Sequence, residues 1–253
     1  MKSLLMLVFD VIGFMAHFRR FYSTATSLSY YFPPRNTIAG LLAAILGRER
    51  DSYYDLFSSE NCGLAVSILT PLRKLTLPIN YLDTDQVTLS RLRGIGGRVP
   101  TTIEFVLPEP PHTSLRYRIY VTCQNSEIFN ELVRRVKTKT PVYPLSLGPA
   151  YCLAELLYVF DGKATIQHSN GDEFLISTVI REDLIAPNGL IPRENIKIII
   201  EERLPPNFTH NREPTGRSFN YIFEANGRQI PVRIKGDVFS IVLSGEVVYG
   251  VFM

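Results

Sequence analysis

Apolar residues along the chain follow two kinds of spacing, one typical of strands and one typical of helices. Residues 4–14 are apolar on both faces, which predicts a strand at the centre of a covered sheet. Residues 38–46 have helical spacing and end at Gly47, with Asn36 or Thr37 expected to cap their exposed amides. Residues 125–137 form the pattern of an amphipathic helix. Strand patterns cover residues 64–70, 101–107 and 115–122 and part of 151–161.

The order of these elements is strand, helix, strand, a long excursion, strand, helix, strand. This βαββαβ order is that of ferredoxin-like and RNA-recognition-motif domains, in which two helices cover one face of an antiparallel sheet. We therefore predict an α+β fold with such a domain over residues 1–160. The excursion at about 75–111 is longer than a compact domain needs as a connection, so we expect it to be a functional insertion.

The remainder of the chain, residues 161–253, has the pattern of a β-rich carboxy-terminal subdomain. Asn226-Gly227 between two alternating runs predicts a hairpin, and Gly236-Asp237 and Ser244-Gly245 predict further turns. Residues 205–218 contain two prolines in a row and several polar residues, which indicates a surface loop.

Composition excludes several classes of protein. The 253 residues are 45% hydrophobic and 20% charged, values that rule out disorder and coiled coil. Cys62, Cys123 and Cys152 are too widely spaced for a disulfide framework or a zinc site, and the four histidines have no metal-ligand spacing. No stretch reaches the ~20 apolar residues that span a bilayer. We expect a cytoplasmic protein with no cofactor, no metal, no membrane contact and no small-molecule substrate.

The small net charge by itself favours no partner, but its distribution along the chain is uneven. The net charge is +3, but residues 1–150 carry +6 and residues 151–253 carry −3. This asymmetry favours an anionic partner for the first part of the chain.

The loop between the first strand and the first helix, residues 17–34, and the residues just after it combine basic and aromatic side chains. Guanidinium groups neutralise phosphates, aromatic rings stack on unpaired bases, and a helix amino terminus binds anions. The candidate RNA-binding residues here are His17, Arg19, Arg20, Tyr22, Ser29, Tyr30, Arg35 and Asn36. We expect the three arginines to hold phosphates and the two tyrosines to offer stacking faces. The alternative is that the aromatic residues fill the core and the arginines form a solvated rim.

The sequence of these segments resembles that of a known family. The stretches GFMAHFR at 13–19 and SYYFPPRNTIAGLLAAILG at 29–47 are similar to the amino-terminal signature of the Cas-five family of CRISPR-associated proteins, in the RAMP superfamily. Residues 141–154, with YPLSLG and CLA, and residues 200–205 are similar to later segments of the family. The resemblance implies a subunit of a type I Cascade complex that grips the 5′ handle of the CRISPR RNA and docks the backbone and large subunits in antiviral defence.

The resemblance also gives the excursion at 75–111 a role, that of a thumb that folds over the RNA. Its RNA-facing charges would then be Arg91, Arg93 and Arg98. The sequence Gly94-Ile95-Gly96-Gly97 between them lacks the complete spacing of a nucleotide-binding loop. A flexible tip flanked by arginines accounts for it better.

One branch of the family cleaves precursor RNA without metal, using a tyrosine, a lysine and a histidine. That tyrosine falls on Tyr30, but the chain has no adjacent Lys-His pair, and His112 has no lysine near it in sequence. Arginine cannot readily pass a proton near neutral pH. We therefore expect a non-catalytic RNA-binding subunit. Two alternatives stay open at this point, a metal-independent endoribonuclease and an interaction module that binds no RNA.

Overall fold

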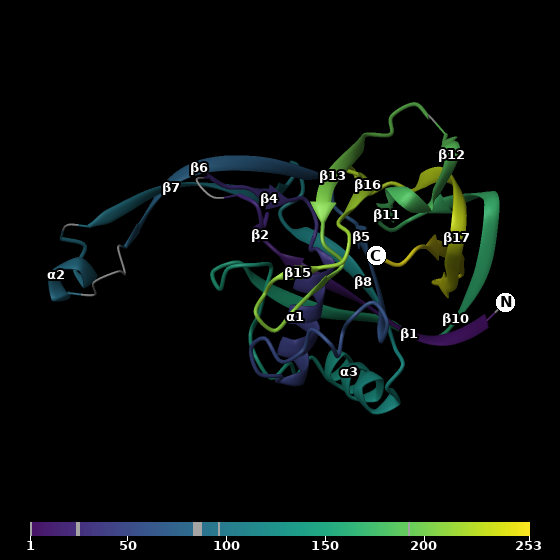
Figure 1. Ribbon diagram of the computed structural model, residues 1–253, viewed down its shortest axis with the longest axis horizontal. Coiled ribbons are helices and arrows are strands. Elements are labelled where there is room, and N and C mark those ends of the chain that lie inside the picture. Colours follow the sequence, from purple (N-terminus) through teal and green to yellow (C-terminus); the bar gives the residue numbers. More distant parts are fainter. Residues whose placement is uncertain (1, 24–25, 83–87, 96, 192) are drawn as a thin grey trace.

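The computed structural model describes residues 2–23, 26–82, 88–95, 97–191 and 193–253. Strands predominate and helices are few, so the predicted α+β class is confirmed. Figure 1 shows a body of packed strands and helices from which one long hairpin projects, with a short helix at its tip. No helix in these described ranges is long and apolar enough to cross a membrane.

Four antiparallel strands form one end of the largest sheet, in the order β10-β1-β8-β5 with β5 at the edge. Helix α1 follows β1 along the chain, and helix α3 follows β8. Both helices contact each other on one side of the body (Figure 1). The bounds are β1 Lys2–Gly13, α1 Arg35–Leu46, β5 Cys62–Ile68, β8 Leu115–Cys123, α3 Ser126–Thr138 and β10 Leu153–Ile176.

Strand β1 is covered on both faces, as its apolar run predicts. Successive side chains of a strand point to opposite faces. Leu7, Phe9 and Val11 therefore belong to the core that contains α1 and α3. Met6 and Val8 belong to a second cluster on the other face. All five side chains are completely buried.

Helix α1 begins at Arg35, one residue before Asn36, the first of the two residues expected to cap it. Its N-cap is Pro34, whose carbonyl oxygen accepts hydrogen bonds from the backbone amides of Thr37 and Ile38. The prediction that Asn36 or Thr37 caps the helix is wrong, because both lie inside the first turn. Gly47 ends the helix with a left-handed φ of 72°, as expected for glycine at this position.

The long excursion is a two-stranded hairpin. Strand β6 (Leu72–Leu82) pairs with β7 (Arg98–Pro108) over its whole length, and helix α2 (Leu89–Leu92) lies at the tip. Figure 1 shows the hairpin reaching far from the body. The sequence predicted the insertion and the strand at 101–107 but not β6. Strand β3 (Thr26–Ser27) of the first loop pairs with the middle of β7, at Thr102 and Ile103.

Strand β10 joins the two expected parts of the chain. Its first half pairs with β1 and its second half pairs with β17. The boundary expected between residues 160 and 161 falls inside β10, so no linker separates the parts. The remaining strands of this sheet are β9 Leu145–Ser146, β12 Ile185–Leu190, β17 Ile230–Leu243 and β18 Glu246–Gly250.

A separate three-stranded sheet, in the order β11-β16-β13, packs onto the body beside the hairpin base. Short pairs β2-β4 and β14-β15 complete the strands described, and a 3₁₀ turn η1 follows β11. The bounds are β2 Phe18–Arg19, β4 Ser29–Tyr30, β11 Ile180–Arg181, η1 Glu182–Leu184, β13 Ile198–Leu204, β14 Asn207–Phe208, β15 Pro214–Thr215 and β16 Phe219–Glu224.

The three predicted turns have different outcomes. Ser244-Gly245 joins β17 and β18 as a hairpin, and both residues have positive φ. Asn226-Gly227 is a turn, but it leads from β16 in one sheet to β17 in the other, so no hairpin forms. Gly236-Asp237 is no turn, because β17 runs straight through it beside β10, which carries a bulge at the same level.

Candidate nucleic-acid interface

A groove of about 930 Å³ lies between the first loop and the outer part of the paired strands β6 and β7. Three segments surround it. The loop contributes residues 17–19, the hairpin contributes Tyr81 and residues 99–101, and the turn before β10 contributes Gly148, Pro149 and Tyr151. The groove is therefore built where the sequence predicted RNA contact, with the hairpin as one wall.

His17 forms part of the floor of this groove. Its Nδ1 lies 2.8 Å from the backbone oxygen of Glu104 on β7, and its ring packs edge-on against Phe105. Desolvation by burial lowers the pKa of His17 below its usual 6.5, so the ring is neutral at pH 7. A neutral imidazole can take part in hydrogen bonds but adds no charge for a phosphate.

Gly148 allows the turn before β10 to approach His17 closely. A Cβ at this position would lie 2.0 Å from the backbone oxygen of His17, and φ is 108°. The amide of His17 donates to the oxygen of Leu147 at 3.0 Å. This close approach requires glycine, and it joins the segment 141–154 to the first loop.

Arg19 is the exposed cation on the loop side of the groove. Its guanidinium makes one long hydrogen bond, 3.3 Å from Nη2 to the backbone oxygen of Ser23. Tyr22 is partly exposed nearby on the same loop, with its ring edge-on to Phe21. Arg19 therefore suits the predicted phosphate contact, whereas Tyr22 does not line the groove and its hydroxyl accepts a hydrogen bond from Arg20.

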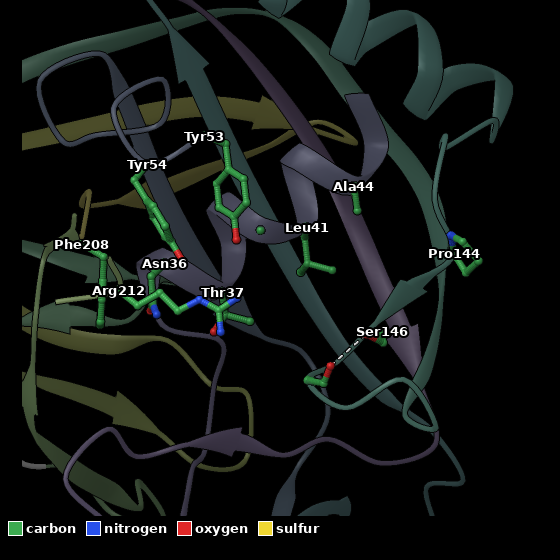
Figure 2. A pocket seen from close by; sticks show the side chains of 12 residues that line it. Asn36, Thr37, Leu41, Ala44, Tyr53, Tyr54, Pro144, Ser146, Phe208 and Arg212 are labelled. Carbon is green, nitrogen blue, oxygen red and sulfur yellow. Dashed lines mark hydrogen bonds between the residues drawn. The ribbon is translucent and has the colours of Figure 1, made fainter. Parts of the chain in front are cut away.

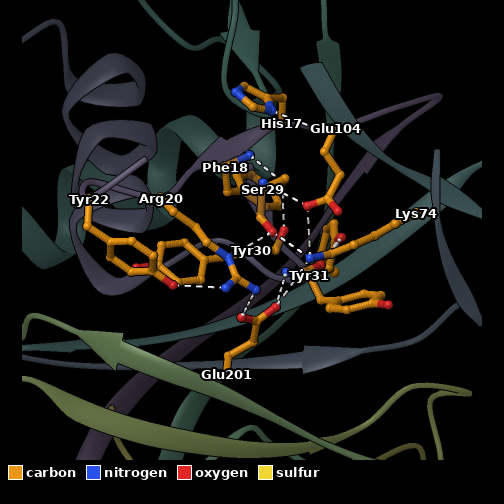
Figure 3. A network of polar contacts seen from close by, with 11 residues as sticks. His17, Phe18, Arg20, Tyr22, Ser29, Tyr30, Tyr31, Lys74, Glu104 and Glu201 are labelled. Atoms are coloured by element: carbon orange, nitrogen blue, oxygen red, sulfur yellow. Dashed lines mark hydrogen bonds and ion pairs between the residues drawn. The ribbon is translucent and has the colours of Figure 1, made fainter. Parts of the chain in front are cut away.

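Arg20 points away from the groove into a buried network (Figure 3). Its Nη2 pairs with Glu201 on β13 at 2.5 Å, its Nη1 donates to the Tyr22 hydroxyl at 2.8 Å, and its guanidinium lies 5.3 Å from the centre of the Tyr30 ring. The predicted phosphate contact is therefore corrected, because a carboxylate already neutralises this arginine.

Lys74 on β6 completes the network. Its Nζ lies 3.0 Å from Glu104, 3.6 Å from Glu201 and 2.6 Å from the backbone oxygen of Ser29, and it lies 4.2 Å from the centre of the Tyr31 ring. Burial raises the pKa of Glu201, against the opposing effect of the two nearby cations. Two cations and two carboxylates thus connect the first loop, the hairpin and β13 (Figure 3).

Three predicted site residues are core residues instead. Ser29 is fully buried, accepting from the Phe18 amide and donating to the Tyr30 carbonyl. Tyr30 is 2% exposed, and burial raises the pKa of its hydroxyl, which has no hydrogen-bond partner among the described residues. Arg35 is also 2% exposed, and desolvation lowers its pKa to about 10. These residues cannot reach an external strand, which corrects their assignment to RNA contact.

Arg35, the first residue of α1, instead holds the segment that leads from α1 into β5. Its Nη2 donates to the backbone oxygens of Phe57 at 3.0 Å and Cys62 at 2.5 Å. Those carbonyls precede and begin β5, so the arginine stabilises the return of the chain into the sheet.

Asn36 lies beside a second hollow of about 400 Å³ along one face of α1 (Figure 2). Tyr53, Tyr54 and Arg212 also line it, and Arg212 pairs with Asp51 at 2.9 Å. Thr37 and Gly148 line both this hollow and the groove, so the two adjoin at the amino-terminal turn of α1. The structure thus places Asn36 next to the groove but outside it.

Arg91 lies on α2 at the tip of the hairpin and Arg93 directly follows that helix, whereas Arg98 begins β7 next to Val99, which lines the groove (Figure 1). Arg93 and Arg98 are exposed, and Arg91 on α2 is partly exposed, with its amide donating to the Thr88 hydroxyl. Gly96 of the glycine-rich tip, and Asp83 and Asp85 before it, lie outside the described residues. Of the three thumb arginines, Arg98 is therefore the one next to the groove that Arg19 lines, while Arg91 and Arg93 belong to the tip.

Two tyrosines that the sequence analysis missed stand across the groove from the loop. Tyr81 on β6 and Tyr151 before β10 approach to 3.5 Å between their hydroxyl oxygens, and both rings are about half exposed, at 42% and 48%. Exposed rings beside a cation are the side chains on which unpaired bases stack. Their separation of 70 residues in the chain explains why no local pattern revealed them.

Residues 6–86 match the family described as "CRISPR-associated protein (Cas_Cas5)". Over these residues the chain is similar to this CRISPR-associated family. The match runs from β1 past the end of β6 and contains both stretches, 13–19 and 29–47, on which the resemblance was based. The recognition from sequence is confirmed.

Two solved structures are similar to this chain. The "Crystal structure of a CRISPR protein from Archaeoglobus fulgidus" is similar with a TM-score of 0.55 and 15% identity, covering 99% of this chain and 100% of that one. This similarity shows a shared fold along the whole chain. A chain of a "CRISPR RNA-guided surveillance complex" matches with a TM-score of 0.47 and 14% identity, covering 91% of each. No curated protein matches the chain.

Proposed function

We propose that this CRISPR-associated protein is a non-catalytic subunit of a Cascade complex that binds the 5′ handle of the CRISPR RNA and docks the backbone and large subunits. The observation that carries the proposal is the groove between the first loop and the hairpin. It has the exposed Arg19 on the loop side and two half-exposed tyrosines, Tyr81 and Tyr151, across it. A cation with stacking rings is the usual composition of a site for single-stranded nucleic acid.

The topology supports the same proposal. The strand order β10-β1-β8-β5, with a helix after β1 and another after β8, is the order we infer to be ferredoxin-like. In RNA-recognition domains of this type the sheet and its connecting loops present the RNA-binding side chains. Here the loop after β1 supplies one wall of the groove, and the hairpin between β5 and β8 supplies the other.

A binding experiment tests this function. Fluorescence anisotropy with labelled repeat-derived handle RNA would compare the wild-type protein with Arg19→Ala over a range of salt concentrations. Removing one cation that neutralises a phosphate lowers the salt slope of single-strand binding by about 0.7. Arg233→Ala, an exposed arginine on β17, is the matched control. An unchanged affinity and slope for Arg19→Ala would show that the groove does not hold the RNA.

The burial of Tyr30 supports the non-catalytic form of the proposal over the endoribonuclease alternative. A general base or nucleophile must lose its proton, and burial raises the pKa of this hydroxyl. We expect repeat RNA to stay intact when incubated with the purified protein and a chelator. Cleavage that Tyr30→Phe abolishes would establish the enzyme instead.

The third possibility, an interaction module without RNA contact, makes a different prediction. Such a protein would co-purify with the other subunits, and its assembled complex would bind guide RNA equally well with wild-type protein or Arg19→Ala. Under our proposal the substitution weakens RNA retention in the assembled complex as well as in isolation.

A further inference from the structure

Cys62 and Cys123 lie directly opposite each other on neighbouring strands. Cys62 opens β5, Cys123 ends β8, and the register pairs them. Their sulfur atoms are 2.7 Å apart, and both are free thiols. The sequence analysis excluded a disulfide between these cysteines because 61 positions separate them in the chain. The pairing of β5 with β8 brings them side by side.

The backbone around the two cysteines has the geometry that a cross-strand disulfide needs. The Gln124 amide donates to the Asn61 oxygen at 3.0 Å, whereas the Cys62 amide turns away to Ser58 at 2.9 Å. The ladder bond therefore belongs to the neighbouring pair, and the cysteines form a non-hydrogen-bonded pair. Such pairs have Cα atoms about 4.5 Å apart, within the range of about 4.4–6.8 Å found for disulfides.

A small oxidant can reach the thiols. Both cysteines line a surface hollow of about 450 Å³ beside the amino terminus of α3, together with Gly63 and Phe129. Cys123 is partly exposed there, while Cys62 is buried behind it. Access on one side and a partner on the other are the two conditions for selective oxidation of a thiol.

The electrostatic surroundings favour one thiolate. Hydrogen bonding to Cys123, and then the positive charge of Arg35, lower the pKa of Cys62, against the effect of burial. The carbonyl of the same cysteine accepts a hydrogen bond from Arg35. The arginine that holds the start of β5 thus also lies close to the thiol pair.

We propose that Cys62 and Cys123 form a reversible oxidation site that closes into a disulfide on exposure to peroxide. In the first step the Cys62 thiolate attacks one peroxide oxygen, breaking the O–O bond and leaving a sulfenic acid, while the released hydroxide takes up a proton to become water. In the second step the Cys123 sulfur attacks the sulfenic sulfur, loses its proton, and releases a second water. Two thiols and one peroxide give one disulfide and two waters, and a dithiol reductant reverses the change.

Cys152 provides the internal control. It is 1% exposed, is not paired with another thiol in the described residues, and burial raises its pKa to about 11. It should stay reduced under conditions that oxidise the pair. Cys152→Ser should therefore behave as the wild type in every oxidation measurement.

The experiment treats the purified full chain with hydrogen peroxide and measures intact mass and a non-reducing peptide map. We expect loss of two hydrogens, one cross-linked peptide joining Cys62 to Cys123, and a melting temperature that rises by about 5 °C or more because the bond constrains a long loop of the unfolded chain. Dithiothreitol should restore the original mass and melting temperature. Cys123→Ser should give no cross-link and should instead accumulate sulfenic acid at Cys62, trapped with dimedone.

Other outcomes would overturn the proposal. These are a cross-link that involves Cys152, dimers formed through Cys123, oxidation of each thiol to sulfinic acid without a bond between them, or no reaction. Neither the assay nor its result depends on RNA, so failure here would leave the proposed function standing.

Discussion

Arg35 shows at the scale of one residue how an arginine in a basic, aromatic segment can serve the fold instead of a ligand. Its guanidinium is buried and bonded to the carbonyls of Phe57 and Cys62, which lie 22 and 27 positions further along the chain. Sequence reasoning assigned it to phosphate because of the basic and aromatic residues around it. Nothing near it in sequence reveals two carbonyls that need a donor, so only the fold distinguishes the two roles.

We predict that Arg35→Met lowers the free energy of unfolding by about 3 kcal/mol, because it leaves two buried carbonyls without a donor. Urea denaturation would measure this. Arg35→Lys, which keeps a donor on a shorter reach, should reduce stability less. A variant with unchanged unfolding and weakened RNA binding would return Arg35 to the interface.

His17 gives a pH-dependent prediction. Burial holds its folded pKa below the 6.5 of the unfolded chain. Above pH 6.5 both states are neutral and its contribution to stability is complete. As pH falls below 6.5 the unfolded state binds the proton first, so stability is lost until the folded pKa is reached, at no more than about 1.4 kcal/mol per pH unit.

We therefore predict that wild-type protein loses stability between pH 7 and pH 5 more steeply than His17→Gln does. Urea denaturation at several pH values would give both curves, and their difference removes contributions from other groups, such as His210, whose pKa is raised by its bonds to Asp51 and Asp55. Parallel curves would mean that His17 titrates normally.

The hairpin shows, at the scale of an element, where patterns fail. The sequence predicted its position and one of its strands, because residues 101–107 alternate. Strand β6 lacked that signal, since much of it is exposed on both faces and Pro78 interrupts it. Proline is tolerated because β6 is the edge of its sheet, where a missing amide breaks no ladder.

The exposed arginines of the hairpin can be tested as a pair. We predict that Arg93→Ala with Arg98→Ala weakens binding of guide RNA and lowers the salt slope by about 0.7 for each phosphate that is no longer neutralised. The melting temperature should not change, because both side chains are exposed. Arg233→Ala with Lys235→Ala on β17 removes the same charge elsewhere and serves as the control. Equal effects of the two double variants would indicate nonspecific attraction only.

At the scale of the whole molecule, the chain is less divisible than its sequence indicated. The pattern of strands after residue 160 predicted a second subdomain, yet β10 belongs to both parts. A local pattern identifies a strand but not its length or its partners. The segment 200–205 was noticed only through the family resemblance, and its role is visible once Glu201 meets Arg20, 181 positions away.

The contact of Glu201 with Arg20 and Lys74 ties the hairpin, the first loop and β13 together, so removing it should affect all three. We predict that Glu201→Ala lowers the free energy of unfolding by about 3 kcal/mol, because it leaves two partly buried cations without their carboxylate. Arg20→Ala removes one of those cations. The double variant should then be more stable than the sum of the two single effects implies, by about 1 kcal/mol or more.

A double-mutant cycle by urea denaturation measures that coupling, and limited proteolysis of the hairpin gives a second readout. Glu201→Ala should speed cleavage within β6 and β7, because Lys74 and Glu104 on those strands then lack a fixed neighbour. Arg233→Ala should leave both measurements unchanged. Strictly additive effects would mean that the two residues contribute separately. If the hairpin also kept its protease resistance, β-sheet pairing alone would hold the hairpin wall of the groove. Any weaker RNA binding by Glu201→Ala would then have a cause outside this network.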